Sequence, residues 1–431
     1  MSVHDRARVR SAAVDGLQMA DAGVLTMKAG ALEFCREHKA ALPFLILFTA
    51  SLFLPSASLR LVFYILAPFL CSFLYKARHE LKPFIQTRSF AFLMLYLAYF
   101  LASGLWSDNF TIGEMVKLLR NVVGIGLFCT ALAVAIPRFN FNVNKAPFYF
   151  AGACLAWGVL CVVLFYGFEG REWEERLQGL GRYDNSIHLA LLFCCATLAL
   201  ICAWDNKAER HTLQISGMMV GFLALIALTQ TRSAYVGLGL CLLPMFFFGH
   251  KKCVAIIVAF AVFAIGIVFF SGLVPVGELG NRLDSYRFEI WSEAIEGIEQ
   301  FPVTGHGVLV EPTFFDHVVR AHKNGFSSTH NVFLGHAYFG GFIGLFLFLC
   351  ISVNIAYVLL KRYMQERAAG AYSYSLRFGT LMICLVYAAS LFNFAHYVVN
   401  VHVQWIFFWA PFSLIWSFEA ANAGAGRPVH A

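Results

Sequence analysis

The chain consists of long apolar runs separated by short polar connections. The hydrocarbon core of a bilayer is about 30 Å thick and takes about 20 apolar residues per helix. The first, second and eighth runs are short, which suits tilted or partly re-entrant helices. The pattern predicts twelve membrane-spanning helices, near residues 42–58, 60–75, 89–105, 114–136, 147–167, 186–204, 212–230, 233–248, 253–271, 332–360, 376–394 and 397–417.

The composition agrees with this pattern. The chain is 59% hydrophobic and only 13% charged, with a mean hydropathy of +0.68. A soluble domain does not carry so little polar surface, so the sequence predicts an all-α polytopic membrane protein. With the N-terminus inside, the inner connections hold 21 of the 32 basic residues and the outer ones 11. This asymmetry predicts that both termini are cytoplasmic, and it explains the positive net charge without a nucleic-acid partner.

The predicted spans form one transmembrane domain, residues 42–417, between a cytoplasmic leader at 1–41 and a cytoplasmic tail at 418–431. A large outer loop, 272–331, lies between spans nine and ten and is long enough to contain helices of its own. A second outer segment, 167–185, is charged and rich in glycine. Loops of this length are usually functional.

Two arginines stand on the outer side at places that disfavour a cation. Arg232 lies in the short turn between two apolar spans, and Arg287 lies in a stretch of the large loop, 282–300, whose apolar residues recur at helical spacing. At 100° per residue, Arg287 falls on the apolar side of that helix. A guanidinium held there needs an anion, and its fork of donors suits a phosphate. The alternatives are a snorkelling Arg232 and a salt bridge from Arg287 to a nearby acid.

A histidine precedes the tenth span. His330 follows Ser328 and Thr329, which the sequence suggests as N-cap residues of that helix. The positive end of a helix dipole disfavours a cationic imidazole, so the neutral form is expected. A neutral imidazole can act as a general base near neutral pH. The alternative is a histidine that only hydrogen-bonds the helix cap.

Further basic residues are candidates for binding a substrate. Lys117 and Arg120 lie at the outer start of the fourth span, where Glu114 is the simplest partner for Arg120. Arg182 lies just before the sixth span, and the alternative for it is a solvated loop residue. The histidines of the large loop lack the spacing of metal ligands, and no nucleotide-binding motif occurs, so neither a metal nor a cofactor is expected.

The tenth span is rich in glycine near its start. Gly340 and Gly344 have the GxxxG spacing, with Gly341 beside them. This spacing is more typical of close helix packing than of chemistry.

Together these residues resemble the O-antigen ligase family, within the wider group of O-antigen polymerases and ligases. The resemblance covers the C-terminal half well, while the N-terminal half matches only in hydropathy. It is carried by the motifs Thr231-Arg232-Ser233, Tyr286-Arg287 through Trp291, Gly305-His306-Gly307, and His330-Asn331 followed by Gly340-Gly341.

The resemblance implies a GT-C-like fold in the bacterial inner membrane, with the active site facing the periplasm. It implies transfer of a polysaccharide from undecaprenyl pyrophosphate to lipid A–core, with inversion and without a metal. His330 would then deprotonate the acceptor hydroxyl, while Arg232 and Arg287 would hold and neutralise the pyrophosphate. The expected partners are the lipid-linked glycan, the lipid A–core acceptor and membrane lipids. The residues assigned to substrate binding are Lys117, Arg120, Arg182 and Asn331.

Three other activities remain open at this point. O-antigen polymerases often carry an arginine followed eleven residues later by glycine, and no outer arginine here has that spacing. Protein O-oligosaccharyltransferases usually continue into an extra C-terminal portion, which this chain lacks after its last predicted span. A lipid-linked glycan flippase or transporter predicts matching halves and charge at mid-membrane, whereas charge here gathers at one face.

Overall fold

The computed structural model describes most of the predicted membrane domain. The described residues are 46–47, 50, 54–138, 146–204, 212–249, 254–255, 258, 287–312, 314, 328–399 and 402–425. Those from 47 onward belong to one compact unit, Leu47–Ala431. The predicted leader, 1–41, lies outside the described residues.

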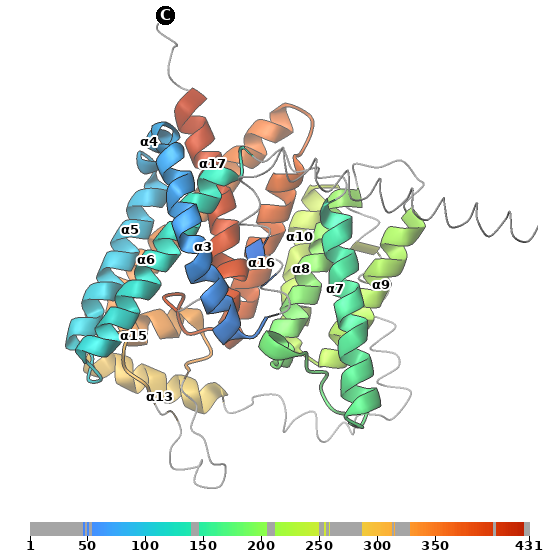
Figure 1. The fold of residues 1–431 in the computed structure, drawn as a ribbon, viewed down its shortest axis with the longest axis horizontal. Coiled ribbons are helices and arrows are strands. Elements are labelled where there is room, and N and C mark those ends of the chain that lie inside the picture. The colour runs from blue at the N-terminus through green and yellow to red at the C-terminus, as the bar shows by residue number, and fades with distance from the viewer. Residues whose placement is uncertain are drawn as a thin grey trace, which may run out of the picture. The chain divides into compact units, whose positions relative to one another are not determined.

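Helices make up this unit, and the described residues contain no β-strand. The α-helices are α3 (Ser56–Lys76), α4 (Leu81–Ile85), α5 (Arg88–Ser103), α6 (Ile112–Ala135), α7 (Ala146–Val162), α8 (Ser186–Trp204), α9 (Thr212–Thr229), α10 (Arg232–Phe247), α13 (Arg287–Gln300), α15 (Val332–Ala368), α16 (Tyr374–Asn393) and α17 (Ala410–Ala425) (Figure 1). Short 3-10 or π turns are η1 (Arg78–Glu80), η2 (Gly104–Trp106), η3 (Val163–Phe168), η4 (Gly181–Tyr183) and η6 (Trp405–Trp409).

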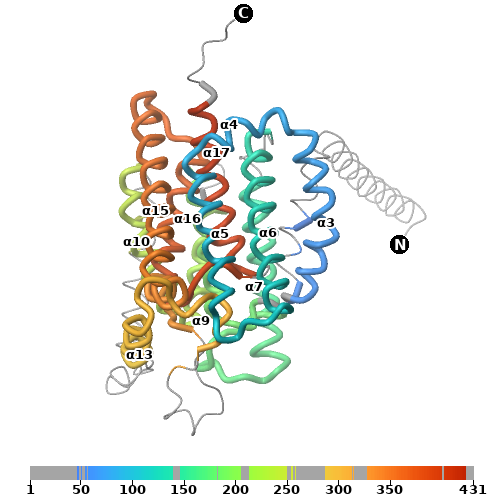
Figure 2. The backbone as a smooth tube through the Cα atoms, turned by 90° about the vertical axis from the view of Figure 1, so that its left-hand side faces the viewer, coloured from blue at the N-terminus to red at the C-terminus, as the bar shows by residue number. Residues whose placement is uncertain are grey.

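The helices pack in two neighbouring groups that α16 joins. In the first group α6 packs against α3, α5 and α17, and α15 packs against α5 and α17 (Figure 2). In the second group α8 is central and contacts α7, α9, α10 and α16. Every residue of α8 from Leu189 to Ala203 is buried, as expected for a helix that is apolar all round. Outward-facing side chains such as Phe69, Leu95 and Leu243 are exposed and suit contact with lipid.

The helices agree with the predicted spans where the structure describes them. Seven of the described helices are long and apolar enough to cross a membrane, and α9 and α10 are shorter apolar helices. Ten of the twelve predicted spans fall on α3, α5–α10 and α15–α17. The other two, near 42–58 and 253–271, lie mostly outside the described residues, so the number twelve stays a prediction.

The last predicted span was placed too early in the sequence. Residues 394–399 are not helical, and the helix begins only near η6 before α17 continues to Ala425, into the predicted tail. The non-helical stretch contains the buried residues Phe394, Tyr397 and Val398. Because it is as apolar as a span, hydropathy alone does not separate it from the helix.

Helix α13 lies across one end of the helical unit, the end opposite α4 (Figures 1 and 2). It ends at Gln300, and the chain then turns through Gly305 and Gly307, which both have positive φ angles. This confirms the predicted helix end at residue 300. The turn is hydrogen-bonded to α15, since the backbone N–H groups of His306 and Gly307 donate to the carbonyls of Tyr338 and Phe339.

Helix α15 is interrupted where this turn meets it. Gly341 has φ 60° and ψ −166°, and a Cβ there would overlap the carbonyl of Val303. A Cβ at Gly340 or Gly344 would press on Phe100 of α5. The predicted close helix packing at Gly340 and Gly344 is therefore confirmed, while Gly341 has the additional role of receiving the 301–307 segment.

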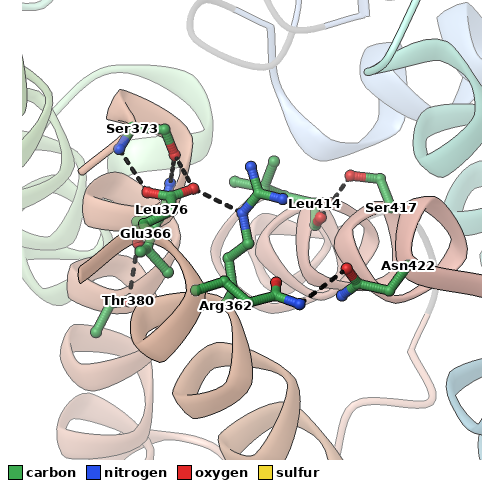
Figure 3. A network of polar contacts seen from close by, with 9 residues as sticks. Arg362, Glu366, Ser373, Leu376, Thr380, Leu414, Ser417 and Asn422 are labelled. Carbon is green, nitrogen blue, oxygen red and sulfur yellow. Dashed lines mark hydrogen bonds and ion pairs between the residues drawn. The ribbon is translucent and has the colours of Figure 1, made fainter. Parts of the chain in front are cut away.

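The far end of α15 is tied to α16 by a buried carboxylate (Figure 3). Glu366, only 9% exposed, accepts hydrogen bonds from Arg362 Nε at 2.6 Å, from Ser373 N at 2.6 Å and from Ser373 Oγ at 2.9 Å. Ser373 in turn caps α16 by accepting from the N–H of Leu376. These bonds fix the connection between two long helices at the end away from α13.

Candidate active site

The turn between α9 and α10 carries Arg232. Gln230 adopts the left-handed conformation, φ 49°, which reverses the chain within two residues. Thr231 is buried, and its hydroxyl donates to the carbonyl of Ser186 at 3.2 Å. Arg232 is the first residue of α10, and its side chain is exposed. The turn therefore presents this guanidinium at the helix start.

A second arginine, Arg176, reaches the same turn from the segment between α7 and α8. Its Nε donates to the carbonyl of Thr229 at 3.2 Å. The backbone runs alongside the turn, since Leu177 N donates to Leu228 O at 2.9 Å and Gln230 Nε2 donates to Glu174 O at 2.9 Å. A longer bond of 3.5 Å runs from the Arg176 guanidinium to Thr231 Oγ1, so four hydrogen bonds between the two segments hold Arg176 next to Arg232.

Arg287 is the first described residue of α13 and is half-buried. Its Cζ lies 5.2 Å from the centre of the Phe392 ring, at the end of α16. Helix α13 is held against α15 partly because Gly297 leaves room for the Tyr338 ring, and partly because the carbonyl of Gly297 lies 2.9 Å from His306 Nε2. The prediction that Arg287 points with the packing side of its helix agrees with this placement.

His330 lies in the turn that leads into α15. Its φ is 48°, a left-handed conformation that is uncommon for a residue with a Cβ. Its N–H donates to Ser328 Oγ at 3.2 Å, and the preceding carbonyl of Thr329 accepts from Trp291 Nε1 of α13 at 3.1 Å. The tryptophan therefore links the histidine turn to the helix that carries Arg287.

The N-cap of α15 is Asn331, and the prediction of Ser328 and Thr329 as caps was wrong. Asn331 Oδ1 accepts from Phe333 N at 2.9 Å and from Leu334 N at 3.2 Å. Ser328 and Thr329 instead use their hydroxyls within the turn. Because the Asn331 oxygen is occupied by the cap, its predicted role in substrate binding is restricted to the amide nitrogen.

The electrostatics show that these groups lie near one another. Loss of water around the guanidinium of Arg287, together with the charges of Arg232 and Arg176, lowers the pKa of Arg287. Desolvation and the charge of Arg232 likewise lower the pKa of Arg176. We call Arg176, Arg232 and Arg287 the arginine cluster. An anion bound among them would replace their mutual repulsion by attraction.

The histidine lies within the field of this cluster. Partial burial, and then the charge of Arg287, lower the pKa of His330 below its ordinary value of 6.5. The imidazole is therefore neutral at pH 7. The structure thus brings Arg232, Arg287 and His330 into one electrostatic environment, while their chemical roles stay predictions.

The other predicted binding residues lie elsewhere or are not described. Lys117 and Arg120 are on α6, which packs against α3, α5 and α17 rather than against α10 or α13. Lys117 Nζ forms an exposed ion pair with Glu114 at 2.5 Å, so the acid expected to pair with Arg120 pairs with Lys117. Arg120 Cζ lies 5.5 Å from the Tyr64 ring centre. The side chain of Arg182 lies outside the described part of the structure.

Arg176 is the residue that sequence reasoning missed. It lies in the charged, glycine-rich segment that the sequence marks as functional, but so do two other arginines and several acids. Its distance of 56 residues from Arg232 gives no local motif. Only the hydrogen bonds between the two segments, including that from its own side chain to Thr229, single it out.

Comparisons with known proteins agree with this arrangement. A family model described as O-antigen ligase matches residues 217–349. A curated O-antigen ligase of Pseudomonas aeruginosa is 26% identical over 371 residues, which cover 83% of this chain and 84% of that protein. Residues 217–349 of this chain thus match the O-antigen ligase family, and the similarity over most of the chain supports an enzyme of that kind. The family match spans Arg232, Arg287 and His330, whereas Arg176 and the end of α16 lie outside it and are joined to the site by the fold.

Proposed function

We propose that this chain joins a polysaccharide from undecaprenyl pyrophosphate to a hydroxyl of lipid A–core, at the periplasmic face of the inner membrane. The observation that carries the proposal is the arginine cluster beside a neutral His330. Cations gathered at one end of a membrane domain suit a diphosphate that is anchored in lipid. The imidazole beside them suits a hydroxyl that must lose its proton.

The reaction is a single displacement at the anomeric carbon. The acceptor hydroxyl transfers its proton to His330 as its oxygen bonds to that carbon, and the bond from the carbon to the diphosphate oxygen breaks. Negative charge moves onto the leaving diphosphate, where the arginine cluster stabilises it. One displacement inverts the configuration, and no covalent enzyme intermediate is required. The guanidinium groups supply the positive charge that a metal would otherwise supply.

The charge of Arg287 has two effects on this step. It attracts the diphosphate, and it lowers the pKa of His330 so that the base is unprotonated before the acceptor arrives. As the diphosphate leaves, its growing negative charge favours the imidazolium that forms beside it. Base and leaving-group site are therefore coupled.

The test uses the purified protein in lipid nanodiscs with lipid-linked glycan and lipid A–core, in the presence of a chelator and without nucleotide. We expect a ladder of joined product, and His330→Ala is expected to lower the rate by about 10²–10⁴-fold, the usual contribution of a general base. His79→Ala is the matched control, because His79 is an exposed histidine in η1, near α4.

Four results would each count against the proposal. Full transfer by His330→Ala would show that His330 is not the general base. Movement of the lipid-linked glycan between leaflets without joined product would favour a flippase. Extension of the glycan on its lipid carrier without lipid A–core would identify a polymerase, and glycan on a protein acceptor would identify an O-oligosaccharyltransferase.

A further inference from the structure

The end of α16 carries an amide whose two atoms have different surroundings. Asn393 Nδ2 donates to the carbonyl of Ala389 at 2.8 Å and to Ser233 Oγ at 2.8 Å. A carbonyl only accepts hydrogen bonds, so the Ala389 contact fixes which side of the amide is nitrogen. The other atom, Asn393 Oδ1, is buried and meets no hydrogen-bond donor in the described part of the chain. A buried oxygen of this kind is rare in native structures and calls for an explanation.

This oxygen lies beside the arginine cluster. Ser233, to which Asn393 donates, directly follows Arg232 at the start of α10. Phe392, the residue before Asn393, carries the guanidinium of Arg287 over its ring. The end of α16 is therefore the structural link between two arginines that reach the site from different helices.

The chemistry of the oxygen restricts what it can bind. A carbonyl oxygen accepts hydrogen bonds, and the oxygens of an ionised diphosphate also only accept, so the two do not satisfy each other. A sugar hydroxyl or an acetamido N–H does satisfy it. In a lipid-linked glycan, the nearest such groups to the diphosphate are those on the first sugar.

We propose that Asn393 Oδ1 accepts a hydrogen bond from a hydroxyl or acetamido N–H of the first sugar of the donor, and that Asn393 thereby selects among donors. This inference rests on the proposed glycan transfer. The arginine cluster recognises the diphosphate that all such donors share, whereas Asn393 recognises the sugar that distinguishes them.

The test compares donors that differ by one group on the first sugar. Polyprenyl-diphosphate glycans, either intact or lacking one hydroxyl or acetamido group, are given to the purified full-length protein with lipid A–core. We measure kcat/KM for each donor with the wild type, Asn393→Ala and Ser233→Ala. The wild type is expected to disfavour one of the deoxy donors about tenfold, the size of one hydrogen bond of about 1.4 kcal/mol.

The two variants separate recognition from a structural role. Asn393→Ala is expected to use the intact donor about tenfold less well and to treat the intact and deoxy donors alike. Ser233→Ala removes one bond that holds the amide but leaves Oδ1, so it should keep the discrimination. Thermal unfolding of each variant reports the loss of packing separately.

Several outcomes overturn the inference while leaving glycan transfer intact. In the first, the wild type uses every deoxy donor as well as it uses the intact one. This result needs only the wild type, so it does not depend on whether the variants fold. In the second, Asn393→Ala retains the discrimination, so that Oδ1 binds water only. In the third, the Asn393-dependent loss follows deoxy acceptors instead of deoxy donors. Absence of any transfer by the wild type would instead refute the proposed function itself.

Discussion

Replacement of Arg176 by alanine tests whether the structure identifies a functional arginine outside the family match. The change removes one of three charges that surround the proposed diphosphate, while two other bonds still hold the segment to the turn, Leu177 N to Leu228 O and Gln230 Nε2 to Glu174 O. We therefore expect the fold to lose no more than about 2 kcal/mol, the worth of the two bonds from the Arg176 side chain to Thr229 and Thr231.

The effect on catalysis is measured on the folded protein, separately from the effect on stability. A hydrogen bond to a charged group contributes about 1.5–3 kcal/mol, and each 1.4 kcal/mol corresponds to about tenfold. Arg176→Ala is therefore expected to lower kcat/KM for the donor by about 10–150-fold. Arg176→Lys keeps the charge but loses the planar fork, so an intermediate loss is expected.

The assay is glycan transfer in nanodiscs at varied donor concentration, with Arg171→Ala as the matched control. Arg171 lies in the same segment, but its guanidinium pairs with Glu169 and Glu175. The double variant Arg176→Ala/Arg287→Ala should deviate from the product of the single effects, because both arginines would share one diphosphate. If Arg176→Ala stays within about twofold of the wild type, Arg176 does not contact the donor.

Three further predictions follow from the geometry. Because the pKa of His330 is lowered and the neutral form is the base, kcat/KM of the wild type should be flat near pH 7 and fall only below pH 6.5. Arg287→Gln removes the positive charge that lowers the pKa of His330, so the fall in kcat/KM should begin at a higher pH. Gly341→Ala should destabilise the fold by more than about 2 kcal/mol, because Gly341 has φ 60° and a Cβ there would overlap Val303. This is measured as a lower unfolding temperature, and an unchanged unfolding temperature would contradict the kink. Glu366→Ala should cost about 2 kcal/mol of stability, because it leaves Ser373 N without its acceptor. The kcat/KM of the folded protein should not change, since Glu366 is far from α13. A loss of activity without a loss of stability would contradict this.

The helices were predictable because burial in a membrane imposes one pattern. An isolated helix must satisfy its own backbone in lipid, so a run of about 20 apolar residues predicts a span. The same argument fails at Phe394 to Val398, where the apolar backbone is packed inside the protein. A non-helical segment does not occur in contact with lipid, but one that is buried inside the protein can be as apolar as a membrane-spanning helix.

The site was predictable only in part. Arg232, Arg287 and His330 stand out because each is a basic group at an apolar boundary. Arg176 does not stand out, since it lies among other charges in a polar segment, and its place depends on a hydrogen bond to a turn 53 residues away. Asn393 ends an apolar helix, and nothing in the sequence reveals that its oxygen is buried without a donor.

Two turns of this site use a backbone conformation that residues other than glycine avoid. Gln230 and His330 have φ angles of 49° and 48°, and each costs about 1–2 kcal/mol relative to a right-handed conformation. A glycine at position 330 would relax that strain and remove the imidazole at once. The enzyme is thus expected to be less stable than its inactive glycine variant, so that selection for heat resistance alone would favour the loss of catalysis.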